Sequence, residues 1–139
     1  MTALSGPNTG DHYEPRLFTY RMKPGVTIYE GGVVGLVAGL AQPAADVANM
    51  LVVGVADKTV TSRASGTSRI SGTASIVKLL STTGLTRGDV GKKVYVVDDQ
   101  TFTTDASSVS HNIKMGLLRE FVSPTQGYVA FDMPAVVLP

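Results

Sequence analysis

The chain has 139 residues, a length that suits one domain with a core of its own. Its 12 Lys and Arg against 11 Asp and Glu leave a net charge of +1, so no strong field draws it to nucleic acid or an anionic membrane. It has no cysteine, which excludes disulfides, cysteine zinc sites and thiol catalysis. The first residues lack the cationic and apolar stretches of a secretory signal, and the apolar stretch at 31–41 is too short to cross a membrane. We therefore expect a soluble protein that is not exported by that route.

Residues 1–16 form a polar segment interrupted by proline and glycine. Only Met1, Leu4 and Tyr13 among them are large and apolar, so the segment cannot bury enough surface to order itself. Ordering it against another surface costs about 1 to 2 kcal/mol per residue in backbone entropy, which a large contact area has to offset. We therefore predict an extended N-terminal arm that is ordered by a partner protein.

From residue 17 onward, short runs of β-branched residues alternate with turns. The first predicted strands cover residues 17–22, 26–30 and 33–37. Pro24 and Gly25 favour a turn after the first strand, because proline fixes φ and glycine permits a positive φ. Gly31 and Gly32 lie between the second and third strands as a two-residue turn, which predicts a tight hairpin.

The rest of the chain continues the strand pattern. Further strands are expected over residues 51–55, 58–61, 76–80, 92–97, 113–122 and 128–133, with a short one at Phe102. The alanine-rich residues 43–49 allow a turn or two of helix, and residues 59–75, rich in Ser, Thr and Gly, predict a long surface hairpin or a flexible loop. Thr86, with Asp89 three residues on, suggests a capped helical turn that ends at Gly91.

Many short strands without a sustained helical period are typical of an antiparallel barrel or sandwich. We predict an all-β fold: a compact antiparallel β-barrel or sandwich with one short helical turn and the extended N-terminal arm. The body is expected to cover residues 17–133. Residues 134–139 are apolar and bracketed by prolines, which favours an edge strand or a C-terminal docking tail.

Few side chains suggest catalysis or metal binding. His12 and His111 could act as a general base or a metal ligand, but neither has an acid or nucleophile at a useful spacing, so exposed polar residues are the favoured interpretation. Asp98, Asp99 and Asp105 lack the pattern of a calcium-binding loop and are interpreted as turn formers. We predict no enzymatic activity, no cofactor and no metal site.

Basic residues are the remaining candidate for a site. Arg63, Arg69, Arg87, Lys92 and Lys93 could form a basic rim for an acidic partner, although a solvated face is the favoured interpretation. Aromatic residues make up only 6% of the chain and tryptophan is absent, so stacking platforms for single-stranded nucleic acid or sugars are poorly supplied. Binding of single-stranded nucleic acid and binding of carbohydrate are therefore both disfavoured.

Four segments stand out by their order along the chain. They are the PG-then-GG pair within residues 22–36, the VGVA strand within residues 51–56, the LTRGDVGKKVYVVDD segment within residues 84–99, and the late strand at residues 114–123. In this order they resemble the small capsid decoration (cement) proteins of tailed bacteriophages. The resemblance runs from about residue 20 to residue 132, and both ends of the chain are less typical of that family.

The resemblance implies a virion protein without enzymatic activity that joins the assembled, expanded head shell and locks neighbouring major capsid subunits together. It implies a place on the outer surface of the capsid after synthesis in the host cytoplasm, and we expect a β-tulip-like body. The partners would be the capsid lattice and further copies of the chain, as a trimer or a dimer, with no nucleic acid and no membrane. The capsid-contact candidates are Leu4, Pro7, Tyr13, Arg16, Arg63 and Arg69.

Two other functions stay open. A structural component of the tail or the head-to-tail connector would share the β-rich composition and the arm, but would be present in only a handful of copies per particle. A small β-barrel that binds a ligand or carbohydrate predicts a concave site lined by clustered aromatic side chains. Copy number and the lining of any cleft therefore distinguish the three functions.

Overall fold

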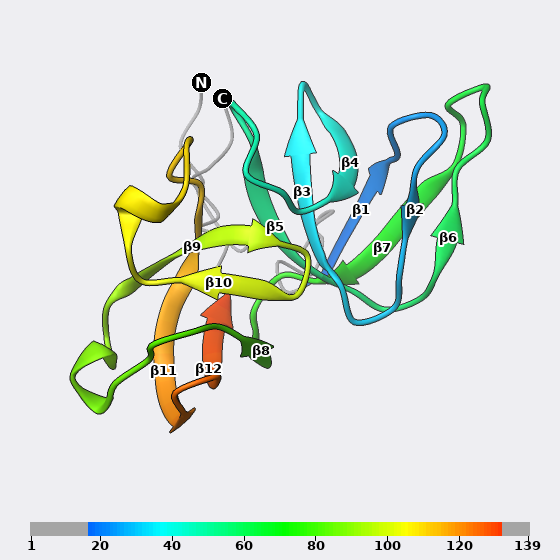
Figure 1. Ribbon diagram of the computed structural model, residues 1–139. Coiled ribbons are helices and arrows are strands. Elements are labelled where there is room, and N and C mark those ends of the chain that lie inside the picture. Colours follow the sequence, from blue (N-terminus) through cyan, green and yellow to red (C-terminus); the bar gives the residue numbers. More distant parts are fainter. Residues whose placement is uncertain (1–16, 132–139) are drawn as a thin grey trace, which may run out of the picture.

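The computed structural model describes residues 17–131, and the all-β prediction is confirmed for them (Figure 1). No helix in this range is long and apolar enough to span a membrane. The strands are β1 (Leu17–Arg21), β2 (Thr27–Ile28), β3 (Val33–Val37), β4 (Leu40–Pro43), β5 (Leu51–Ala56), β6 (Val60–Thr61), β7 (Arg69–Thr73), β8 (Ile76–Ser81), β9 (Lys93–Asp98), β10 (Thr101–Thr103), β11 (Lys114–Ser123) and β12 (Gln126–Phe131). Two short 3-10 turns are η1 (Arg87–Asp89) and η2 (Ala106–Ser108).

The second half of the chain forms a closed barrel with the strand order β10-β8-β12-β11-β9. Its ladders are antiparallel, except that β8 and β10 run parallel and meet at Ser81 and Thr101. Because side chains alternate between the two faces of a strand, Gly127, Val129 and Phe131 of β12 are buried inside the barrel. The barrel core also contains Val94, Val96, Phe102, Met115 and Leu118.

The first half forms a five-stranded sheet with the order β1-β7-β5-β3-β4, accompanied by the two-stranded ladder β2-β6. The sheet curls until β4 reaches the end of β1, where Met22 and Ala41 form a bridge and Lys23 N–H donates to Ala41 O at 2.8 Å. This curl encloses a second core, made of Phe18, Met22, Ile28, Val34, Ala41, Val53, Ala56, Ile70 and Ala74. Figure 1 shows the barrel at lower left and the sheet at upper right, with β5 where the two halves meet.

The hairpin predicted around Gly31 and Gly32 is wrong. β2 pairs with β6 and not with β3, and the turn reaches across to the barrel, where Val33 N–H donates to Asp99 O at 2.8 Å. The hairpin that forms instead joins β3 to β4 through Ala38 and Gly39, whose φ angles are 53° and 81°. Positive φ at both central residues is what a type I′ loop requires. The turn at Gly31 and Gly32 therefore makes a contact between the two halves of the molecule and does not close a hairpin.

Three other expectations are corrected. Residues 43–49 are not helical, because β4 extends to Pro43 and an irregular loop follows. Residues 59–75 are not a hairpin, because β6 pairs with β2 whereas β7 pairs with β1 and β5. The described range has two short helical turns instead of the predicted one. The second, η2, forms where Ser107 N–H donates to Asp105 Oδ1 at 2.9 Å and so caps the turn.

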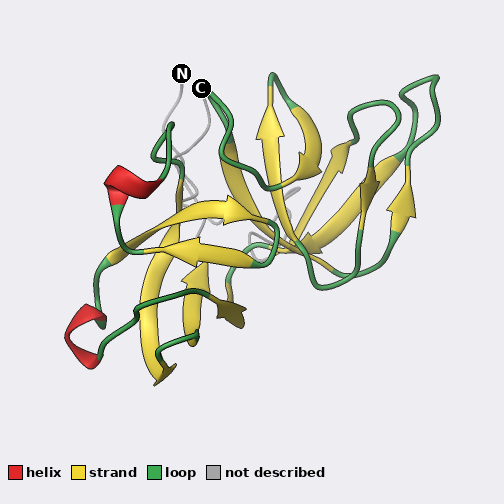
Figure 2. Ribbon diagram, viewed as in Figure 1, coloured by secondary structure: helices red, strands yellow, loops and turns green. Residues whose placement is uncertain are grey.

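The helical turn predicted from Thr86 and Asp89 is confirmed as η1. Thr86 N–H donates to Asp89 Oδ2 at 2.9 Å, and Asp89 N–H donates to Thr86 O at 3.0 Å. Lys92 Nζ lies 3.0 Å from Asp89 Oδ1. The hydrogen bond from Thr86 N–H, followed by the one from Lys92, holds the pKa of Asp89 below its ordinary value. Figure 2 shows that η1 and η2 both lie on the barrel half.

Candidate interaction surfaces

Most of the capsid-contact candidates predicted from the sequence lie outside the described residues. Leu4, Pro7, Tyr13 and Arg16 belong to residues 1–16. Their role as contacts stays a prediction. The two remaining candidates, Arg63 and Arg69, lie within the described range and can be placed.

Arg63 and Arg69 are exposed at the connection between β6 and β7. Arg63 N–H donates to Ser68 Oγ at 3.1 Å, which closes this connection on itself. Arg69 lies directly opposite Arg21 in the β1–β7 ladder, and both side chains are exposed. The fold therefore creates a basic pair at one end of the sheet. The sequence alone did not reveal Arg21 as a member, because the pairing depends on the register of two strands 48 residues apart.

The basic rim considered as an alternative to a solvated face does not form as one surface. Figure 1 places the segment 87–93, yellow-green at lower left, at the opposite end of the molecule from the β6–β7 connection at upper right. The guanidinium carbon of Arg87 lies 4.9 Å from the centre of the Phe121 ring, a cation–π distance. Lys92 pairs with Asp89. These two cations therefore serve local contacts on the barrel.

His111 has an acidic partner that its sequence neighbourhood did not reveal. Asp46 Oδ2 accepts a hydrogen bond from Ser110 N–H at 2.6 Å, and Asp46 Oδ1 accepts one from His111 N–H at 2.9 Å. His111 Nδ1 lies 3.1 Å from Asp46 O. The bond from Ser110 N–H, more than any other contact, lowers the pKa of Asp46. Asp46 thus joins the loop after β4 to the loop before β11, and we call this arrangement the Asp46 clamp. The other histidine, His12, lies outside the described residues.

Two of the three aspartates considered as calcium ligands, Asp98 and Asp105, make the contacts of turn formers. Asp98 Oδ1 accepts a hydrogen bond from Gln100 N–H at 2.9 Å, and Asp105 caps η2. Asp99 is half-buried in the same turn as Asp98. Within residues 17–131, no three His, Cys, Asp or Glu side chains gather closely enough to hold a metal ion.

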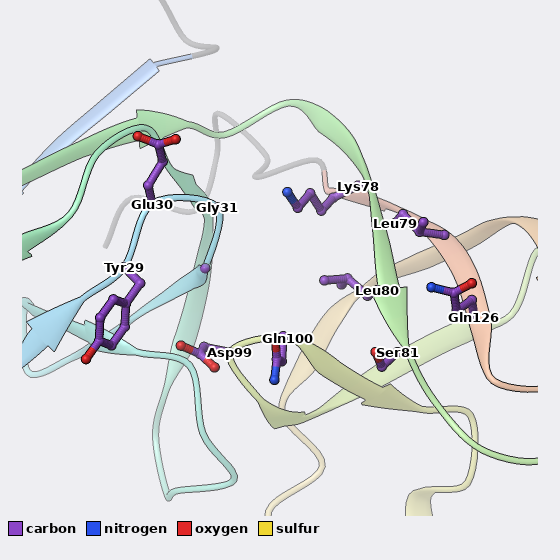
Figure 3. A pocket seen from close by; sticks show the side chains of 11 residues that line it. Tyr29, Glu30, Gly31, Lys78, Leu79, Leu80, Ser81, Asp99, Gln100 and Gln126 are labelled. Carbon is purple, nitrogen blue, oxygen red and sulfur yellow. The ribbon is translucent and has the colours of Figure 1, made fainter.

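A cleft of about 580 Å³ lies where the turn after β2 faces the barrel (Figure 3). Figure 3 shows the Lys78 side chain extending from β8 toward Gly31. A Cβ atom at Gly31 would lie 3.3 Å from Lys78 Nζ, so the ammonium group reaches across the cleft. The other lining residues are Tyr29, Glu30, Gly32, Leu79, Leu80, Ser81, Asp99, Gln100 and Gln126.

The charges of this cleft are not paired with one another. Among the described residues, no carboxylate lies within 4.0 Å of Lys78 Nζ. Burial, and then repulsion by the charge of Asp98, raise the pKa of Asp99. Of the described residues in the lining, Tyr29 is the one aromatic side chain, which differs from the aromatic cluster expected of a carbohydrate site. Sequence reasoning missed the cleft because its residues come from four separate segments.

An apolar row crosses the outer face of the barrel. Leu117 of β11 lies opposite Ala130 of β12, and Ala130 lies opposite Val77 of β8, so their side chains share one face. Leu117 is 46% exposed and Val77 is 43% exposed. Leu79, two residues after Val77 on the same face, is 37% exposed. Adjoining apolar side chains on a surface are typical of sites that bind another molecule.

No protein-family model, curated protein or solved structure matches the chain. The interpretation of these surfaces therefore depends on the chain's own residues.

Proposed function

We propose that the protein is a structural virion protein that decorates and cements the assembled head shell of a tailed bacteriophage by bridging neighbouring major capsid subunits. The observation that carries the proposal is the presence of two chemically different surfaces on two halves of one molecule. The basic pair of Arg21 and Arg69 lies at the end of the sheet, and the apolar row of Val77, Ala130 and Leu117 lies on the barrel. A bridging protein needs at least two separate contacts of this kind.

The segments that carry the family resemblance also support the proposal. They supply the turn before β3, strand β5, the stretch from η1 through β9, and strand β11. Their apolar residues contribute to both cores: Val33, Val55, Leu85, Val96 and Met115 are buried in the barrel core, and Ile28, Val34 and Val53 in the other. The resemblance therefore concerns the residues that determine the body of the protein. On this proposal the protein has no enzymatic activity, and its partners are the capsid lattice and further copies of itself.

Multivalency explains how modest contacts can stabilise a shell. Once one surface is bound, the second meets its partner at a high effective concentration, so the bridge is stronger than either contact alone. The predicted arm at residues 1–16 would add main-chain hydrogen bonds along an open edge of a coat subunit. Repeated around a closed shell, such bridges would resist internal pressure.

The test is to mix the purified protein with empty, expanded head shells and to count bound copies. We expect saturable binding at hundreds of sites per shell and a higher temperature of shell disruption. Deletion of residues 1–16 should leave the β body folded and sharply weaken binding. A handful of copies per particle would favour a tail or connector role, and absence of binding would refute the capsid proposal.

One observation favours a second candidate, a small ligand-binding module. The cleft beside Lys78 has a volume of about 580 Å³, within the range of roughly 300 to 1,000 Å³ that small-molecule sites occupy. Among the described residues its lining is mostly polar, contains one aromatic side chain, and gives neither Lys78 nor Asp99 an ion pair. Chemical shift changes at the Gly31 and Gly32 amides on addition of a monosaccharide panel would support this function.

A further inference from the structure

The barrel has an open strand edge beside the cleft. β8 pairs with β12 along its whole length, from Ile76 to Ser81. On its other side, β8 pairs with β10 at one position only, where Ser81 meets Thr101. The preceding residues of β8 therefore have a ladder on one side and the cleft on the other.

The direction of the backbone groups follows from two hydrogen bonds. Ser81 N–H donates to Gln100 O at 3.0 Å, on the side of β10, whereas Thr82 N–H donates to Thr125 O at 2.9 Å, on the side of β12. Backbone N–H groups alternate in direction along a strand, so Val77 and Leu79 point their N–H and C=O groups toward the cleft, as Ser81 does. No hydrogen bond among the described residues engages these groups of Val77 and Leu79 outside the ladder.

The side chains beside this edge have different chemistry on the two faces of β8. Val77 and Leu79 lie on the outer face, where they continue the apolar row. Lys78 lies on the inner face, with its ammonium group in the cleft and no carboxylate of the described residues within 4.0 Å. Natural proteins usually protect an open edge with charge, proline or a covering loop. At this edge Lys78 is the one charged side chain, and it is flanked by the apolar Val77 and Leu79, so a strand that brings an acidic side chain to Lys78 could add here.

The walls of the cleft limit what can reach the edge. Residues 29–32 and the turn at Asp99 and Gln100 face β8 across the cleft, so a second barrel cannot approach the edge closely. About four residues of an extended segment would match the lining part of β8 in length, because a strand rises about 3.3 Å per residue. Glu30 and Asp99 on the far wall are acidic, which disfavours a segment with many negative charges.

We propose that an extended segment of a coat subunit adds to the open edge of β8, hydrogen bonded to the backbone of Val77 and Leu79. Its apolar side chains would extend the outer row, and one acidic side chain would lie opposite Lys78, because opposite charges on neighbouring strands attract. The inference rests on the proposed function and specifies one of the contacts it requires. It differs from the role of the arm, because here this chain provides the edge and the partner provides the strand.

The first experiment compares substitutions at one position in the shell-binding assay. Leu79→Pro removes an N–H group that points away from β12, whereas Leu79→Ala removes the side chain and keeps the N–H. We expect shell affinity to fall at least tenfold for Leu79→Pro and less than threefold for Leu79→Ala. Amide exchange at Leu80, whose N–H faces β12, checks that the ladder of the proline variant is intact.

The second experiment does not depend on a proline variant that folds. Amide exchange of the wild-type protein is measured free and on shells, and we expect Val77 and Leu79 to exchange fast when free and to become protected on the shell. A zero-length carbodiimide cross-linker then joins Lys78 to any carboxylate in contact with it, and we expect an acidic residue of the coat protein. Lys78→Gln should weaken binding and reduce its salt dependence, whereas Lys114→Gln, an exposed lysine on β11, should leave binding unchanged.

The possible failures can be told apart. If the wild-type protein does not bind shells, the proposed function and this inference are both refuted. If the wild type binds and Leu79→Pro binds equally well, or Val77 and Leu79 stay unprotected on the shell, the inference alone is overturned. A cross-link from Lys78 only to Glu30 or Asp99 of the same chain, or to residues 1–16 or 132–139 of another copy, also overturns the coat-segment inference.

Discussion

Val33 of β3 lies directly opposite Val55 of β5, and both are buried in the barrel core. The next residue of β3, Val34, is buried in the other core, as is Val53 of β5. Successive side chains of β3 point to opposite faces, and a bulge at Val53 in the β3–β5 register places Val53 and Val55 on opposite faces of β5, so this ladder is a wall shared by the two cores. Neither half of the chain can complete its core without this ladder.

The shared wall predicts that both halves unfold together. Val33→Ala should lower the free energy of unfolding by about 1.5 to 3 kcal/mol, because it removes buried methyl groups and leaves a cavity. Urea unfolding of the wild type and the variant should show one transition, and amide exchange in β1 and in β12 should accelerate by the same factor. Two transitions, or an effect confined to the barrel, would contradict the shared wall.

Local patterns predicted the barrel strands better than the sheet. The expected strand at 76–80 is β8, Ile76–Ser81, and the one at 92–97 is β9, Lys93–Asp98, because each is a short, mostly apolar run with β-branched or aromatic residues that is followed by turn residues. Thr86 and Asp89 predicted η1 for a similar reason, since a capping box is a local arrangement. Secondary-structure elements that depend on residues close in sequence could therefore be predicted from the sequence.

The pairing of strands and the positions of the candidate sites could not be predicted from local sequence in the same way. Gly31 and Gly32 suggested a hairpin, but the partner of β2 is β6, more than 30 residues further on. Lys78 and Asp99 meet at one cleft through a barrel whose closure no local pattern encodes. The partner of His111 is Asp46, 65 residues away, so its role as part of a clamp could not be read from its neighbours.

Gly54 of β5 is expected to tolerate no side chain. Its φ is +145°, and a Cβ atom there would overlap Thr73 O. Gly54→Ala should therefore lower the free energy of unfolding by at least about 3 kcal/mol, the combined cost of backbone strain and overpacking. Thermal and urea unfolding measure the change. Gly88→Ala is the matched control, because its Cβ would meet only Thr86 Oγ1, at 3.8 Å, and a change within about 0.5 kcal/mol is expected.

The Asp46 clamp predicts a stability that depends on pH. Hydrogen bonds from Ser110 and His111 N–H favour the charged carboxylate, so the pKa of Asp46 in the folded protein lies below its unfolded value. This stabilisation is complete above the unfolded pKa of about 3.9 and is lost as the pH falls through the folded pKa. Asp46→Asn should cost about 1 to 3 kcal/mol at pH 7, and the difference from wild type should shrink at the acid end of the range.

Urea unfolding at a series of pH values tests the clamp. Asp57→Asn is a suitable control, because Asp57 is exposed and accepts one hydroxyl hydrogen bond, from Ser71 at 3.0 Å. A constant difference between wild type and Asp46→Asn across the whole pH range would show that the charge of Asp46 contributes nothing.

For Asp99 we predict a stability that depends on pH in the opposite direction from that of Asp46. Burial, and then the charge of Asp98, raise the pKa of Asp99 above its unfolded value, so ionising this side chain costs stability. Its contribution is fully favourable below the unfolded pKa and is lost as the pH rises through the folded pKa. Asp99→Asn should therefore raise the melting temperature at pH 7 and leave it nearly unchanged at a pH below the unfolded-state pKa.

Asp98→Asn is the control. It removes the neighbouring charge but weakens the hydrogen bond from Gln100 N–H, so a smaller rise in melting temperature is expected. A lower melting temperature for Asp99→Asn at pH 7 would mean that the ionised carboxylate is satisfied inside the cleft.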